Sequence, residues 1–150
     1  MLPETAPEGP LGKLLWGGLL LALCVLIHAA GLIGLGRLVR NRWEERVTGY
    51  VSDLWLLVRM AWMITLLHLV QIVLWGWFFW GSGGLPDTQT AFYFSSVTYT
   101  TLGYGDVVLP AAWRTMSGLE SLTGILTAGL STGFFFNLLN RILEQRRKHH

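Results

Sequence analysis

The sequence predicts an all-α membrane protein with three transmembrane helices and a re-entrant loop between the second and the third. Three observations predict this fold class: the composition, three long uncharged runs, and a short polar segment that contains alternate glycines. Of the 150 residues, 52% are hydrophobic and 13% are charged, whereas about 25% of the residues in soluble domains are charged. This composition indicates that lipid, rather than water, surrounds most of the chain.

Each of the three uncharged runs is long enough to cross a bilayer as a helix. The runs cover residues 14–36, 60–80 and 115–140, and Glu120 is the only formal charge within them. A hydrocarbon core of about 30 Å needs about 20 helical residues, and tilting accommodates longer runs. A signal peptide is the alternative for the first run, but that run exceeds the roughly 7–15 apolar residues expected, and only Lys13 precedes it as a basic residue. We therefore expect three retained helices.

Residues 81–114, between the second and third runs, are too few and too polar for another crossing. The expected arrangement is a re-entrant short helix over residues 90–100, followed by a strand that returns to the same side of the membrane. Non-helical backbone at membrane depth is tolerated only where protein or a watery cavity surrounds it. This loop is therefore expected to be enclosed by neighbouring copies of the chain.

The most specific motif is Thr-Tyr-Thr-Thr-Leu-Gly-Tyr-Gly-Asp at residues 98–106. Rings of backbone carbonyls can replace the water shell of a cation without adding net charge. Successive carbonyls point at one axis only if the backbone dihedrals alternate and include left-handed values. Such values cost an L-residue about 1–2 kcal/mol and cost glycine little. Gly103 and Gly105 at alternate positions favour this conformation over a glycine turn between two strands.

The segment TTLGYGD resembles the selectivity filter of bacterial potassium channels, and the chain is similar to their pore-domain family over roughly residues 60–141. The resemblance implies an outer helix, a pore helix, a filter and an inner helix. It also implies potassium as the permeant ion, with no cofactor. By similarity, carbonyl oxygens and the Thr101 hydroxyl bind potassium along the filter, which comprises Thr101, Leu102, Gly103, Tyr104 and Gly105. Asp106 forms the outer mouth, where it adds negative potential.

The resemblance also assigns supporting residues around the filter. Thr98 and Thr100 match the threonines that back the filter from the pore helix. Tyr93 and Phe94 match an aromatic cuff that braces the filter tyrosine, here Tyr104.

Two residues depart from the pattern of the family. Leu102 replaces the commoner valine, but the ligand at this position is a carbonyl, so selectivity is expected to persist. Val97 stands where some members have a glutamate that pairs with the aspartate after the filter. That pair cannot form here, and its effect on inactivation stays open.

Polar residues within the apolar runs carry less specific information. Glu120 needs a partner, because burying an ionised group in a span costs about 2.5–3.5 kcal/mol. It either supports the pore helix or attracts cations, or it is an acid at the outer interface. His68 is either hydrogen-bonded between helices or a proton sensor.

The third run contains three glycines and an asparagine that the resemblance places at the inner cavity, with one glycine as a hinge. Positions 129, 133 and 137 share one helix face, and the alternative role for such small residues is close helix contact. The candidate residues are Gly124, Gly129, Gly133 and Asn137.

The distribution of basic residues predicts the orientation. Cytoplasmic loops are rich in Lys and Arg, and the basic residues of this chain gather around residues 37–59 and 141–150. We therefore expect a multi-pass protein of the plasma or inner cell membrane, with its N-terminus outside and its C-terminus in the cytoplasm. The expected parts are an extracellular tail (1–13), a peripheral helix (14–36), a cytoplasmic loop (37–53), a pore domain (54–141) with outer helix (54–80), pore helix (90–100), filter (101–105) and inner helix (114–141), and a basic tail (142–150).

The function that follows is a potassium-selective channel that conducts passively. Only one filter motif occurs, and one strand cannot enclose an ion, so the expected unit is a homotetramer in contact with membrane lipids. The alternatives are a nonselective cation channel and a non-conducting modulatory subunit. An enzyme and a nucleic-acid-binding protein are disfavoured, because the sequence has neither a nucleophile–base set nor room for a basic folded surface.

Overall fold

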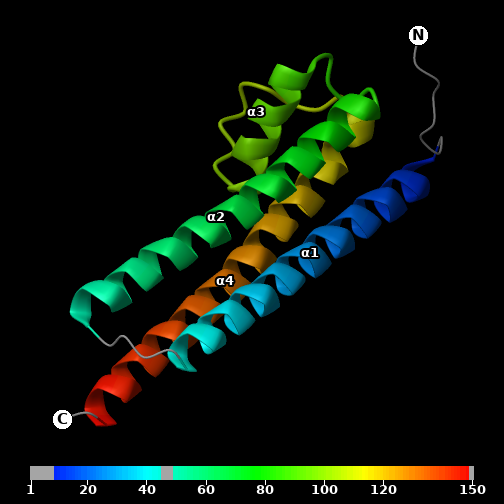
Figure 1. Ribbon diagram of the computed structural model, residues 1–150. Coiled ribbons are helices and arrows are strands. Elements are labelled where there is room, and N and C mark those ends of the chain that lie inside the picture. Colours follow the sequence, from blue (N-terminus) through cyan, green and yellow to red (C-terminus); the bar gives the residue numbers. More distant parts are fainter. Residues whose placement is uncertain (1–8, 45–48, 149–150) are drawn as a thin grey trace.

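The computed structural model describes residues 9–44 and 49–148, which form three long helices with a short helix at one end (Figure 1). Each long helix contains a stretch that is long and apolar enough to cross a membrane. No strand occurs among the described residues, so residues 101–105, which were expected to form a strand, are irregular. A strand needs a neighbouring strand for its backbone hydrogen bonds, and the described part of the chain offers none. The elements are α1 (Pro10–Glu44), α2 (Tyr50–Gly81), α3 (Thr88–Tyr99), the 3₁₀ turn η1 (Ala111–Trp113) and α4 (Arg114–Lys148).

The long helices extend well beyond the uncharged runs. Residues 37–44 continue α1 and residues 50–53 begin α2, so the loop expected over 37–53 is mostly helical. The connection is confined to residues 45–49, of which 45–48 lie outside the described residues. Likewise, α4 continues through residues 142–148, which were expected to form a tail. Charge marks where a span leaves lipid, but Arg, Lys, Glu and Gln are good helix formers, so the helix does not end there.

The short helix α3 begins two residues earlier than expected and has a well-defined N-cap. Asp87 accepts hydrogen bonds of 2.8 Å each from the backbone amide and the hydroxyl of Thr90. These bonds lower the pKa of Asp87 and satisfy an amide that has no partner within the helix. Before this cap, Gly83 has a φ of +72°, and the amides of Gly84 and Leu85 bond to the carbonyl of Phe79. This turn directs α3 back along α2.

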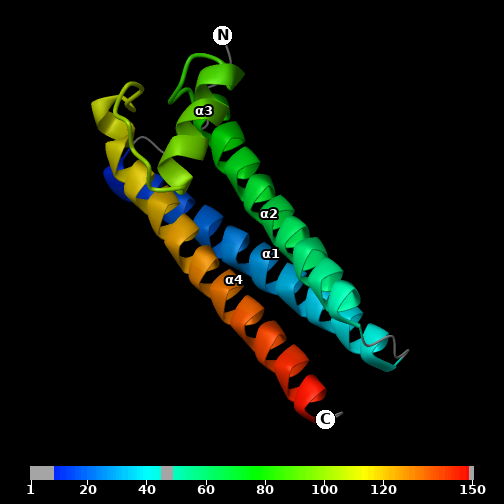
Figure 2. The same cartoon turned by 90° about the vertical axis from the view of Figure 1, so that its left-hand side faces the viewer.

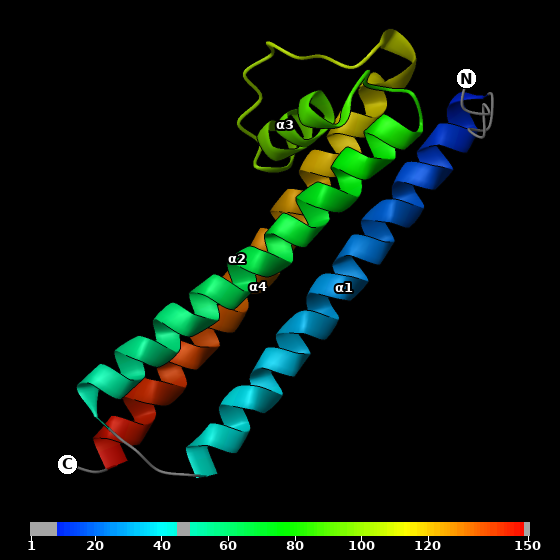
Figure 3. The same ribbon diagram turned by 45° about the horizontal axis from the view of Figure 1, so that its top comes forward.

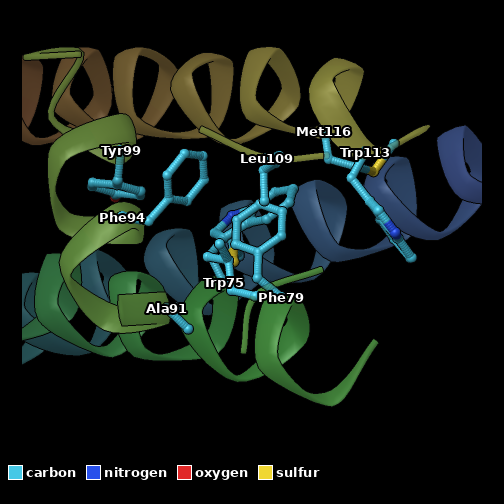
Figure 4. Packing of buried hydrophobic residues seen from close by; sticks show 10 residues of the cluster. Trp75, Phe79, Ala91, Phe94, Tyr99, Leu109, Trp113 and Met116 are labelled. Carbon is cyan, nitrogen blue, oxygen red and sulfur yellow. The ribbon is translucent and has the colours of Figure 1, made fainter. Parts of the chain in front are cut away.

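Helix α3 packs against both α2 and α4, while α1 runs along α4 (Figure 2). After α3, the chain runs out to the end of the bundle and returns to begin α4 (Figure 3). A cluster of buried aromatic and apolar side chains joins all four helices at this end of the bundle (Figure 4). Its members include Cys24, Trp75, Phe79, Phe94, Leu109, Trp113 and Met116.

The opposite end of the bundle is held by a second apolar cluster and by an ion pair. Leu32 and Leu35 of α1, Met60 of α2 and Leu138 of α4 belong to this cluster. Arg146 Nη2 lies 2.6 Å from Asp53 Oδ2, which ties the end of α4 to the start of α2. Large apolar side chains are exposed along all three long helices, as expected for surfaces that face lipid or other subunits.

Candidate functional site

Residues 101–105 have left-handed backbone dihedrals at alternate positions. The φ angles are +61° at Thr101, +58° at Gly103 and +77° at Gly105. The alternating left-handed φ angles expected from Gly103 and Gly105 are therefore present. They begin two residues before Gly103, at Thr101. Threonine is β-branched, so a left-handed φ at Thr101 costs about 1–2 kcal/mol. A strained residue of this kind indicates a position that its surroundings hold in place, often for function.

The start of this segment is fixed by hydrogen bonds to the last turn of α3. The amide of Thr101 donates to the carbonyl of Thr98 at 3.0 Å, and the amides of Leu102 and Gly103 donate to the carbonyl of Val97 at 3.0 and 3.2 Å. Ser121 of α4 also donates to the carbonyl of Thr98, at 3.0 Å. These bonds offset the strain at Thr101 and tie the segment to both α3 and α4.

The two threonines that the resemblance assigned to filter support differ in burial. Thr98 is buried, and its carbonyl accepts the bonds just described. Thr100 is exposed, and its hydroxyl donates to the carbonyl of Ser96 at 2.7 Å. Thr98 therefore stabilises the end of α3 through its backbone carbonyl, and Thr100 does so through its hydroxyl.

Asp106 has a partner that the sequence analysis did not identify. The hydroxyl of Tyr93 donates to Asp106 Oδ2 at 2.6 Å. This bond lowers the pKa of Asp106 and raises that of Tyr93. Val97 cannot pair with the aspartate; instead it lines a cavity of about 320 Å³ behind residues 101–107.

Phe94 and Tyr93 do not enclose Tyr104 within one chain. Phe94 is buried and packs edge-on against Phe79, with ring centroids 5.3 Å apart, and Tyr93 is engaged with Asp106. Tyr104 itself is 68% exposed. Among the described residues, no aromatic ring is in contact with the Tyr104 ring.

Glu120 is fully buried six residues after the start of α4. The hydroxyl of Ser95 lies 2.5 Å from Glu120 Oε1 and 2.7 Å from the carbonyl oxygen of Ile72. Ser95 thus links α3 to both α4 and α2. Glu120 Oε2 and Trp75 Nε1 are buried without a hydrogen-bond partner among the described residues. The carboxyl group lies inside the helix bundle and not at an exposed interface.

The small residues of α4 separate into two groups. Gly124 is buried against the end of α3, where an added Cβ would lie 2.0 Å from the carbonyl oxygen of Tyr99. Gly129 and Gly133 have open space at the Cβ position, and with Asn137 they are exposed on one face. Gly124 therefore serves close packing of α4 on α3, while the other three form a surface open to a partner, to lipid or to water.

Several polar residues with defined contacts were not singled out by sequence reasoning. Five of them lie within the apolar runs, where an uncharged polar residue in a span is the only signal that could have identified them. Ser95 and Tyr99 lie in the segment between the second and third runs. Their partners come from other helices, so the sequence does not indicate which residues meet. These residues are His28, Gln71, Ser95, Tyr99, Ser121, Thr127 and Ser131.

Three helices of spanning length, with an apolar outer surface, define a multi-pass membrane protein. Residues 63–141 match the model of the family described as "Ion channel", which covers slightly more than half of the chain. The chain therefore belongs to this ion channel family. The matched region includes most of α2, all of α3, the segment at 101–106 and most of α4, while α1 lies outside it. No curated protein and no solved structure matches the chain significantly.

Proposed function

We propose that the protein is a potassium-selective channel in which residues 101–105 form the selectivity filter and α3 is the pore helix. The observation that carries this proposal is the left-handed φ at Thr101, Gly103 and Gly105. Alternation of this kind turns successive carbonyls toward a common side, which an ion-stripping filter needs. The sequence of the segment, TTLGYGD, favours potassium over other cations through its resemblance to known filters.

The pore is formed by four copies of the chain. A single segment cannot surround an ion, and closed fourfold symmetry supplies the missing ligands. Two observations support this assembly. Leu102 is 56% exposed and Tyr104 is 68% exposed, although both side chains are large and mostly apolar. Neighbouring copies would cover these side chains, and the exposed face with Gly129, Gly133 and Asn137 would line the inner cavity.

The filter opens to the outside of the cell. The end of α1, the start of α2 and the end of α4 lie opposite α3 (Figure 1). Most arginines belong to these helix ends, whereas Arg114 at the start of α4 lies at the α3 end. Basic ends remain on the cytoplasmic side. The N-terminus is accordingly external and the C-terminus cytoplasmic, in the plasma or inner membrane.

Potassium flux into liposomes containing only the purified protein tests the proposal. We expect potassium flux that greatly exceeds sodium flux, and a cross-linked species of four chains. Equal fluxes would favour a nonselective cation channel, and the absence of flux would favour a modulatory subunit.

Gly103→Ala should abolish this flux while the tetramer persists. The new methyl group penalises a φ of +58° in all four subunits. Gly18→Ala is the matched control, because nothing lies within 4 Å of a Cβ at this helical position. Normal flux through Gly103→Ala would remove the basis of the filter assignment.

A further inference from the structure

Five polar side chains from all four helices meet in the middle of the predicted spans. His28 and Gln71 are fully buried, and Tyr99 and Ser131 are 4% and 8% exposed. The polar ring, as we call the group, consists of His28 of α1, His68 and Gln71 of α2, Tyr99 of α3 and Ser131 of α4.

Hydrogen bonds join these side chains into a closed circuit. Gln71 Nε2 lies 2.8 Å from His28 Nδ1, and His28 Nε2 lies 2.8 Å from Ser131 Oγ. Ser131 Oγ lies 3.1 Å from His68 Nε2, and His68 Nδ1 lies 2.8 Å from the hydroxyl of Tyr99. Tyr99 donates to Gln71 Oε1 at 2.8 Å, which completes the ring.

One direction of donation satisfies every member of the ring. The amide nitrogen of Gln71 can only donate, so His28 Nδ1 accepts and the proton of His28 is on Nε2. Tyr99 uses its single proton on Gln71, so it accepts from His68 Nδ1. Ser131 then donates to His68 Nε2. Each side chain donates once and accepts once around the circuit.

This circuit requires both histidines to be neutral. If the Gln71 amide is turned over, the direction of donation reverses, and each histidine still has one donor and one acceptor nitrogen. A protonated histidine has two donors and cannot take part in either direction. An added proton would force Tyr99 to donate elsewhere, and the nearest alternative is Thr127 Oγ1 of α4, at 2.7 Å.

The ring connects a helix outside the family match to the start of the filter. Tyr99 is the last residue of α3, and the strained Thr101 follows two residues later. His28 belongs to α1, which the ion channel match does not include. The two histidine rings are 4.8 Å apart, so α1 and α2 face each other at this level.

We propose that His28, His68 and Gln71 are positioning residues for conduction. Their neutral ring holds Tyr99 in place, and Tyr99 in turn positions the start of the filter at Thr101. The proposal rests on the proposed channel function. Helix α1 then supports the pore through His28. Acidification reduces potassium flux, because protonation of a histidine breaks the polar ring.

Titratable groups near the ring come from each packed helix. They are Cys24 of α1, His68 of α2, Tyr99 of α3 and Glu120 of α4. These groups are present in both the wild type and a His28 variant. A difference between the pH profiles of the two proteins therefore reports the titration of His28.

The test measures potassium flux in liposomes between about pH 4 and pH 8, because burial moves the charge change of a histidine below its ordinary range. His28→Gln keeps one donor and one acceptor but does not titrate. We expect its flux at the upper pH to be within about twofold of wild type, and its loss of flux on acidification to be smaller. His28→Leu removes the acceptor of one Gln71 N–H and the partner of Ser131, so that Gln71 Nε2 keeps only the carbonyl of Leu67, at 3.2 Å. We expect about a tenfold loss of flux at every pH.

Cys24→Ala is the control for lost packing, because Cys24 is buried one turn from His28 on the same helix. Its flux should equal that of wild type. The proposal is overturned if Cys24→Ala and His28→Leu lose the same flux, or if His28→Leu behaves as wild type. If His28→Leu does not assemble, identical pH profiles for wild type and His28→Gln overturn it. Absence of flux from wild type itself would instead refute the channel function.

Discussion

Replacement of Gly124 by alanine should separate α4 from the end of α3. The added Cβ would lie 2.0 Å from the carbonyl oxygen of Tyr99 and 3.0 Å from its carbonyl carbon. Carbon–oxygen contacts between helices ordinarily measure about 3.3–3.6 Å, so the two backbones must move apart by more than about 1 Å. The carbonyl oxygen and carbon of Tyr99 are backbone atoms, so they cannot rotate away from the new methyl group as a flexible side chain could.

The expected cost is at the upper end of the range for overpacking, about 3 kcal/mol per chain. For a chain of this size, such a loss lowers the midpoint of thermal unfolding by about 10 °C. The displacement also reaches Tyr99, so we expect potassium flux to fall together with stability. Thermal unfolding of the purified protein in detergent, followed by flux in liposomes, measures both effects.

Gly34→Ala is the matched control, because Gly34 is an exposed helical glycine with nothing within 4 Å of the Cβ position. Its midpoint should stay the same or rise, since alanine favours a helix by up to about 1 kcal/mol over glycine. If Gly124→Ala unfolds at the wild-type temperature and conducts normally, α4 and α3 are not in the close contact described above.

Two further predictions concern Glu120 and the topology. Glu120→Gln should preserve a conducting tetramer, because an amide can still bond to Ser95. Glu120→Leu leaves Ser95 only the carbonyl of Ile72 as an acceptor and removes its hydrogen bond to α4, which should cost about 1–3 kcal/mol per subunit. Wild-type assembly and flux in Glu120→Leu would contradict a supporting role. A protease-sensitive tag near Pro7 should be cleaved from outside intact cells, while a tag after His150 should be protected. Protection of both tags would require a different number of crossings.

The features that could be predicted from the sequence are those encoded by neighbouring residues. The apolar runs predict the three long helices, and Gly103 and Gly105 predict the alternating backbone. The charges within residues 37–53 suggested a loop because they mark the edge of the lipid. Helix propensity and backbone hydrogen bonding continue past that edge in residues 37–44 and 50–53.

The partners within the bundle could not be predicted, because they are far apart in the chain. His28 and Ser131 are 103 positions apart, and Ser95 and Glu120 are 25 apart. The sequence indicated that Glu120 needed a partner but not which residue supplies it, and a serine on the buried face of α3 fills the role. Similarly, the pairing of Tyr93 with Asp106 depends on how the segment folds back beside α3.

The way α1 is seated on the bundle limits how the chain can be divided. At Gly31, an added Cβ would come within 2.6 Å of the Leu67 side chain, and at Gly17 within 2.7 Å of Met116, so α1 fits closely against both α2 and α4. A fragment restricted to residues 63–141 would turn Gln71 and Ser131 toward hydrocarbon without the imidazole that bonds to both. We therefore expect the region that matches the ion channel family to be less stable without α1, and shortened versions made for study should retain the first helix.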